Sequence, residues 1–162
     1  MAPTWGQRLC ILASMTPEEL AVARARADAA PDDVDLQMQA AYGCDRWGTE
    51  EDAVVYYDRA YRLRERISAD ALPNFLVGYG STLRNVKRLD ESRALLESAV
   101  AEFPGNRTLR SFLALSLLDL RRPDEAVAAL IDVILSFADA APEIARYARA
   151  LAYYRDELRA RG

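Results

Sequence analysis

The chain has 162 residues, of which 51% are hydrophobic, so it can bury a substantial core, and we expect a single domain over residues 1–162. Its net charge of −4 argues against a protein that binds DNA or RNA through phosphate contacts, because such contacts need an excess of Lys and Arg. The absence of histidine excludes Ser–His and Cys–His catalysis and the common zinc sites.

The amino-terminal segment from Met1 to Ser14 contains one short apolar run, from Leu9 to Ala13, with a single Arg before it. This run is too short for the core of a secretion signal and far shorter than a membrane span. We therefore expect a cytoplasmic protein that does not contact the membrane. In that compartment Cys10 and Cys44 are expected to be reduced thiols, with Cys44 facing the core.

The first helix signal is a capping sequence in which Thr16 precedes Pro17 and Glu19 follows three positions after Thr16. A hydroxyl cap, proline in the first helical position and a Glu at the third predict a helix from here to about Ala29. Residues 31–33 then break the helix. Residues 1–33 are thus predicted to form an N-terminal segment and helix.

A helical hairpin is predicted for residues 34–68, which we call repeat 1. From Val34, apolar residues follow one helical stripe. They are Leu36, Ala40, Ala41 and Cys44. Residues 46–49 make a turn, and a second helix opens at Glu50 and closes near Ile67.

Further along the chain, the same pattern occurs twice, and the two members of every matching pair are 34 positions apart. The pairs are Gly80 and Ala114, Leu83 and Leu117, Asp90 and Asp124, Glu91 and Glu125, Leu96 and Leu130, and Ala99 and Val133. This period is typical of stacked helix-turn-helix units, which predicts repeat 2 over 73–105 and repeat 3 over 107–139. Repeat 1 fits at an offset of 39 positions from repeat 2, so five extra residues must lie between Arg66 and Pro73, in a prolonged helix or a bulged loop.

One more step of 34 positions, starting from Leu113, Ala114 and Leu117, carries the pattern to Tyr147, Ala148 and Leu151. This predicts a last helix from about Pro142 to Arg159, within a capping element at residues 142–160. Several arginines on this helix suit a polar cap at the end of a stack.

The repeated positions suggest how the helices pack. Small side chains at Ala41, Gly80 and Ala114 would allow a neighbouring helix to approach closely. Four leucines are expected to fill the space around these contacts. They are Leu83, Leu96, Leu117 and Leu130.

Together these residues resemble the tetratricopeptide repeat (TPR), with a small residue in the first helix, a larger one three positions later, and an acidic pair and a small residue opening the second helix. Pro104 ends its repeat where the family commonly has proline, and the runs 78–84 and 102–105 are similar to a small bacterial subgroup with three repeats. The resemblance implies an all-α fold, a right-handed superhelical stack of antiparallel helix pairs (a TPR-like α-solenoid) with an N-terminal helix and a C-terminal capping helix. The chain departs from the family where a large aromatic residue is favoured, at Gln37, Leu76 and Arg110.

Two kinds of charged cluster could indicate chemistry but have simpler explanations. Acidic pairs at Glu51–Asp52, Asp90–Glu91 and Asp124–Glu125 open helices, where negative charge favours the positive end of the helix dipole. Arg59 and Arg66, with Arg62 between them, share one helical face, which is either a solvated, ion-paired face or a patch for an acidic partner. We therefore expect no enzyme, no cofactor and no metal site.

The resemblance implies that the first helices line a groove for a peptide. Carried over residue by residue, the groove comprises Met38, Tyr42, Asp45, Asn74, Val77, Ser81, Arg84, Thr108, Ser111, Leu115 and Leu118. Its apolar members would form a trough with Arg84 as a polar anchor, and the Lys, Asn and Arg clamp of some chaperone-binding relatives is missing. An equally weighted alternative is that the N-terminal segment folds back into the trough through Trp5, Leu9, Ile11 and Leu12.

The function expected from the sequence is a protein–protein interaction scaffold that binds a peptide or a helix of a partner in its concave groove. The partner's identity does not follow from the sequence. The alternative is a self-associating structural subunit, a homodimer without a peptide ligand.

Overall fold

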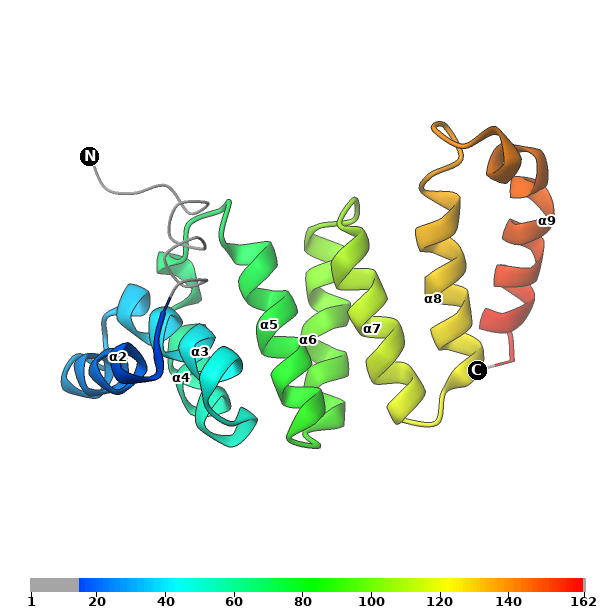
Figure 1. Cartoon of the computed structure of the whole chain (residues 1–162). Helices are drawn as coiled ribbons and strands as arrows, with labels where there is room; N and C mark the ends of the chain where they lie inside the picture. The colour runs from blue at the N-terminus through cyan, green and yellow to red at the C-terminus, as the bar shows by residue number, and fades with distance from the viewer. Residues whose placement is uncertain (1–14, 162) are drawn as a thin grey trace. The chain divides into compact units, whose positions relative to one another are not determined.

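The computed structural model describes residues 15–161, and within this range the secondary structure is entirely helical (Figure 1). The chain divides into two compact units, one ending at Val86 and the other beginning at Lys87. Within each unit, consecutive helices pack against each other. The prediction of an all-α, TPR-like arrangement of helix pairs is confirmed for this part of the chain.

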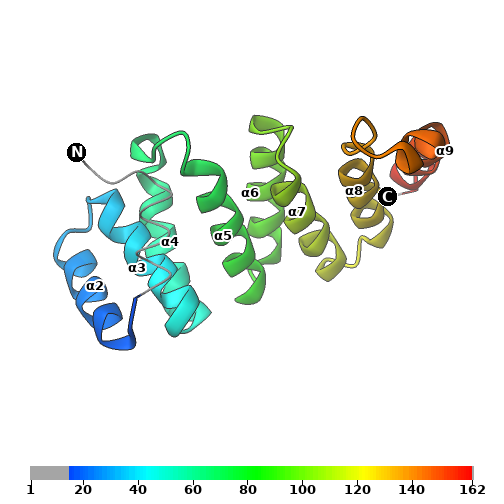
Figure 2. The same ribbon diagram turned by 45° about the horizontal axis from the view of Figure 1, so that its top comes forward.

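The first unit contains α2 (Pro17–Ala29), α3 (Val34–Trp47), α4 (Glu50–Arg62), the short 3-10 helix η1 (Arg64–Arg66) and α5 (Leu72–Asn85). α2, α3 and α4 lie side by side in both ribbon views (Figure 1 and Figure 2). The expected capping sequence begins α2, because the Thr16 hydroxyl accepts a hydrogen bond from the Glu19 amide and the Glu19 carboxylate accepts one from the Thr16 amide.

The five extra residues lie between α4 and α5. α4 ends at Arg62, and η1 and a loop lead to Leu72, so the insertion forms a loop with a 3-10 turn rather than a longer helix. Of the two alternatives raised by the sequence, the loop is therefore correct.

The second unit contains α6 (Leu89–Glu102), α7 (Arg107–Asp119), α8 (Pro123–Leu135) and α9 (Pro142–Arg159). α7 packs between α6 and α8, and α8 packs against α9. The bounds of α9 match the predicted capping helix. Asn106 begins α7 by accepting a hydrogen bond from the Leu109 amide at 3.1 Å.

The repeated small side chains are buried, as expected. Ala41 is 0% exposed, Ala114 is 2% exposed, and Gly80 is buried as well. In the second unit, the hydroxyls of Ser92 and Ser116 form a buried hydrogen bond of 2.8 Å between α6 and α7. Small residues therefore occupy the contacts between neighbouring helices, where larger ones would force the axes apart.

Three of the four leucines expected in the core are buried, namely Leu83, Leu96 and Leu117. The expectation for Leu130 was wrong, because this side chain is 42% exposed although its equivalent Leu96 is 0% exposed. α8 instead buries Ala128 and Ile131, whose equivalents on α6 face the solvent.

Leu130 is exposed because of the position of α9. Arg155 and Arg159 of α9 both bind the carboxylate of Asp132 on α8, which fixes α9 to that side of α8. Asp132 lies about 160° around the helix from Leu130, taking about 100° per residue. α9 therefore does not cover the side of α8 that carries Leu130.

This difference in burial predicts different costs of truncation. Leu96→Ala should lower the free energy of unfolding by ~2–5 kcal/mol, since it leaves a cavity in a closed core. Leu130→Ala should cost only about 1 kcal/mol, because much of that side chain is already in water. Urea denaturation followed by circular dichroism measures both values. Equal costs for the two variants would contradict the burial of α8 described above.

Candidate functional site

The predicted groove residues of the first unit come from α3 and α5. On α3, Met38, Tyr42 and Asp45 follow at spacings of four and three, so they share one face of the helix. Met38 is only 2% exposed, and the Tyr42 hydroxyl is buried. These two side chains thus contribute to the interior of the unit more than to its surface.

Asp45 is held by two hydroxyl groups from neighbouring helices. Its carboxylate accepts a hydrogen bond of 2.5 Å from the Tyr57 hydroxyl of α4 and one of 3.0 Å from the Thr82 hydroxyl of α5. Burial raises the pKa of Asp45, while these two hydrogen bonds act in the opposite direction. The carboxylate therefore ties α3, α4 and α5 together.

Tyr57 is also the centre of an aromatic cluster. Its ring makes an edge contact with Tyr42 at 5.8 Å between centroids, stacks on Tyr79 at 5.6 Å and lies 5.5 Å from Phe75. A Cβ atom at Gly78 would overlap the Tyr57 hydroxyl, so the glycine in the middle of α5 makes room for it. Tyr42 is thereby packed against the core, and burial raises its pKa.

The α5 residues of the predicted groove are all at least partly accessible. Asn74 is exposed, and Val77, Ser81 and Arg84 are partly exposed, at spacings that place all four on one face of α5. In the first unit, the predicted groove residues that an external ligand could reach are therefore these four on α5 and the exposed Asp45 on α3.

In the second unit the predicted residues all lie on α7. Thr108 is exposed, and the Ser111 hydroxyl donates a hydrogen bond of 2.9 Å to the backbone oxygen of Arg107. Leu115 and Leu118 are 41% and 53% exposed, one turn apart on the side of α7 opposite the buried Leu117. This side of α7 has apolar groups in contact with water.

The acidic pairs open helices, as expected, and several of their members bind arginines. Arg24 of α2 forms two hydrogen bonds with the carboxylate of Asp52, at 3.0 and 3.1 Å. Arg88 binds Glu91 in the same way and lowers the pKa of that carboxyl, and Arg122 binds Glu125. These carboxylates have structural partners.

The arginine face is engaged as well. Arg59 forms an ion pair of 2.6 Å with Asp28, and Arg66 donates a hydrogen bond of 3.0 Å to the backbone oxygen of Asp32. The ion-paired face is therefore the better interpretation for Arg59, and Arg66 has a structural hydrogen bond instead.

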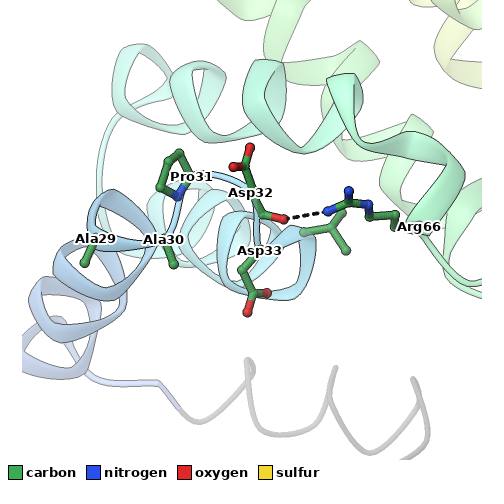
Figure 3. Close-up of a pocket in the computed structure, with 7 residues that line it drawn as sticks. Ala29, Ala30, Pro31, Asp32, Asp33 and Arg66 are labelled. Atoms are coloured by element: carbon green, nitrogen blue, oxygen red, sulfur yellow. Dashed lines mark hydrogen bonds between the residues drawn. The ribbon is translucent and has the colours of Figure 1, made fainter.

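A recess of about 590 Å³ that the sequence did not suggest lies at the turn between α2 and α3, lined by residues 29–34 and Arg66 (Figure 3). Asp33 begins α3 by accepting a hydrogen bond from the Leu36 amide, and Arg66 holds the turn through Asp32. Next to the turn, the buried amide of Gln37 donates hydrogen bonds to the backbone oxygens of Ala27 and Ala30, at 2.6 and 3.1 Å. Gln37 therefore replaces the family's aromatic residue with a cap for the end of α2.

The sequence analysis missed the Asp45 cluster and this recess. A signal for the cluster was present, because Tyr57 places a hydroxyl at the position that Leu96 and Leu130 fill with apolar groups. Such a hydroxyl needs a hydrogen-bond partner when it is buried.

Residues 15–161 contain no group of three or more Cys, Asp or Glu side chains that could hold a metal ion. In the same range, none of the helices combines the length and the apolar character needed to cross a membrane. Cys44 is a buried free cysteine, and burial raises the pKa of its thiol to about 11, which makes it a poor nucleophile. Cys10 lies outside the described residues.

The Asp45 cluster predicts a pH dependence of stability. In the folded state Asp45 holds its proton more tightly than in the unfolded chain, where its pKa is ~3.9. Its contribution to stability is therefore largest at low pH and falls as pH rises from about 3.9 through the raised folded value. Asparagine does not titrate, so the stability of Asp45→Asn does not fall in this way. Relative to the wild type, its free energy of unfolding should therefore rise as pH rises from about 3.9 through the raised folded pKa of Asp45.

Urea denaturation at a series of pH values checks this expectation. Tyr57→Phe serves as a matched variant, because it keeps the ring but removes a hydrogen bond that lowers the pKa of Asp45. In that variant the fall in stability should extend to higher pH. A difference between Asp45→Asn and the wild type that does not change with pH would contradict the assignment.

Comparison with known proteins supports the repeat pattern. A family model described as Tetratrico peptide repeat matches residues 35–158, which is more than half of the chain. No curated protein and no solved structure matches the chain significantly. The match covers α3 to α9 almost completely, including the small residues that are buried between helices. The chain therefore belongs to the tetratricopeptide repeat family.

Proposed function

We propose that this protein is a non-catalytic scaffold that binds a peptide or a helix of a partner protein through the first helices of its repeats. Tetratricopeptide repeats generally mediate protein–protein interaction, and such arrays present extended binding surfaces. The observation that supports the proposal most is the exposure of Leu115 and Leu118 on one face of α7. Large apolar side chains held in water at helical spacing favour contact with a partner.

In this proposal the groove residues have different roles. Leu115 and Leu118, with Thr108 and Ser111 before them on α7, contact the ligand in the second unit. In the first unit, Asn74, Val77, Ser81 and Arg84 of α5 do so. Met38 and Tyr42 support the surface from within, because Met38 and the Tyr42 hydroxyl are buried, whereas Asp45 is exposed and bonded to the hydroxyls of Tyr57 and Thr82.

Peptide display on the purified protein, followed by fluorescence anisotropy of the selected peptides, tests this function. We expect dissociation constants in the micromolar range, or ~−8 kcal/mol. Leu118→Glu should weaken binding by about tenfold or more, since it places a charge in an apolar contact. Val55→Glu is the matched control, because Val55 is 43% exposed on α4, outside the proposed groove, and should leave affinity unchanged.

The proposal fails if no peptide binds, or if Val55→Glu weakens binding as much as Leu118→Glu. An Arg84→Glu variant tests the polar anchor in the first unit separately. An acidic peptide group that binds Arg84 would then be repelled, whereas a ligand that does not use it would bind unchanged.

The alternative that residues 1–14 occupy the groove stays a prediction, since they lie outside the described residues. If Trp5, Leu9, Ile11 and Leu12 fill the groove, deleting residues 1–14 should lower the melting temperature and increase the fluorescence of a dye that binds apolar surfaces. It should also increase the affinity for the selected peptides. Unchanged melting, dye fluorescence and affinity would contradict an intramolecular ligand.

A second candidate function is self-association, and it is favoured by apolar side chains that α8 leaves exposed. They belong to a different helix from Leu115 and Leu118.

A further inference from the structure

α9 differs from the other helices in how little of it is buried. Among the α-helices within residues 15–161, it is the one without a buried residue, although with 18 residues it is also the longest. The apolar side chains that share a face with Arg155, which binds α8, are only partly buried. They are Ile144, Ala148, Leu151 and Leu158. Exclusion of water therefore contributes little to the attachment of α9.

The helix at the other end of the described chain, α2, is attached more firmly. α2 has 13 residues and buries Leu20, Ala23 and Ala27. Its first turn has a capping box, and its last turn receives hydrogen bonds from the buried amide of Gln37. The N-cap position of α9 is Ala141, which has no side chain that could accept such a bond. A terminal position alone therefore does not explain how little of α9 is buried.

Ion pairs tie α9 to α8. Arg155 and Arg159 of α9 both bind the carboxylate of Asp132 on α8. The Asp132 side chain is 14% exposed, whereas those of Arg155 and Arg159 are 24% and 50% exposed. Dissolved ions screen ion pairs that the solvent reaches more strongly than they screen buried ones. The attachment of α9 thus depends on charges that respond to the solvent.

The connection between α8 and α9 allows α9 to move without α8. Arg107 of α7 donates hydrogen bonds to the Ser136 hydroxyl at 2.7 Å and to the Ser136 backbone oxygen at 2.8 Å, and its guanidinium lies 4.0 Å from the centre of the Phe137 ring. These contacts fix the end of α8. A movement of α9 would therefore begin in residues 138–141, of which three are alanine. Short segments with small side chains are frequent hinges.

We propose that α9 is a strap that detaches reversibly from α8 while α6, α7 and α8 stay folded, and that the ion pairs of Asp132 set how often it does so. Ala128 and Leu135 lie one turn before and one turn after Asp132 on the same side of α8, so detachment brings them into water. In the closed structure Ala128 is buried and Leu135 is half-buried. The second unit thus has an apolar surface that is accessible only in the open state. This inference goes beyond the proposed function and does not depend on peptide binding at Leu118.

Detachment should be visible at the backbone amides of α9. A helix of this length is only marginally stable alone in water, so a detached α9 loses its helical hydrogen bonds. Its amides then exchange with the solvent. The amides of α6 and α7 are protected until these packed helices themselves unfold. The two sets of amides therefore report two different opening reactions.

Hydrogen–deuterium exchange of the full chain, measured by NMR at single amides, tests the strap. In the wild type, the protection factors of α9 should be at least about 100-fold lower than those of α6. They should also depend little on low concentrations of urea, because detachment exposes little surface. Asp132→Asn should lower the protection of α9 by about a further tenfold and leave that of α6 unchanged.

Salt provides a second readout of the same ion pairs. Raising the NaCl concentration from about 0.02 M to about 1 M should lower the protection of α9 in the wild type by about threefold, because the Debye length falls to about 3 Å. In Asp132→Asn the same change in salt should have a much smaller effect, since the ion pairs with Arg155 and Arg159 are already lost.

Asp52→Asn is the matched control at the other terminal helix, because Asp52 of α4 binds Arg24 of α2 through two hydrogen bonds. It should leave the protection of α9 unchanged and lower that of α2 by less than about threefold, since α2 keeps its buried side chains. Equal protection of α9 and α6 in the wild type, or protection of α9 that survives Asp132→Asn, would overturn the proposal. So would an equal loss of protection in α6 and α9. These measurements contain no peptide, so they do not decide the proposed binding at Leu118.

Discussion

One position in the second helix of each repeat has to be covered by the helix that follows it. Tyr57 meets this requirement in the first unit, where the rings of Phe75 and Tyr79 lie against it. The equivalent Leu96 likewise has no exposed surface. A helix pair in a repeat array cannot bury its apolar face alone, so burial at this position depends on what comes next in the chain. Where the following helix docks elsewhere, as at Leu130, an apolar surface is left open.

The first unit combines this apolar contact with a polar one. Tyr57 is covered by aromatic rings, and its hydroxyl still reaches a carboxylate, Asp45, which also binds Thr82. A buried hydroxyl without a partner would cost ~1–3 kcal/mol, so the hydrogen bond to Asp45 is what allows tyrosine at a position that leucine occupies elsewhere. Asp45 itself stays exposed, so its carboxylate joins the three helices at the surface of the unit.

The fold could be predicted from the sequence largely because the signals were local and repeated. The Thr16 capping box, the small residues at Ala41, Gly80 and Ala114, and the limits of α9 follow from short patterns that tertiary contacts did not override. Leu130 was predicted wrongly because a constant interval between repeats assumes that every helix is followed by a helix in the same position. A warning was present in α8, where the run from Ala126 to Ile131 is apolar on every side, so periodicity could not say which side would be covered. The Asp45 cluster depends on three helices at once, which the interval alone does not describe.

α9 packs against α8 on the side that carries Asp132. The Asp132 side chain is 14% exposed, and it binds Arg155, which is 24% exposed, and Arg159, which is 50% exposed. Covering the exposed part of Leu130 would gain only about 1 kcal/mol. Arg155 and Arg159 therefore hold α9 on the Asp132 side, and the apolar side of α8 stays open. At the equivalent position on α6 the chain has Ser98, which is exposed and needs no charged partner from the helix that follows. An ion-paired acidic residue in the last repeat thus lies where α9 packs, and apolar side chains on the other side of α8 stay in contact with water.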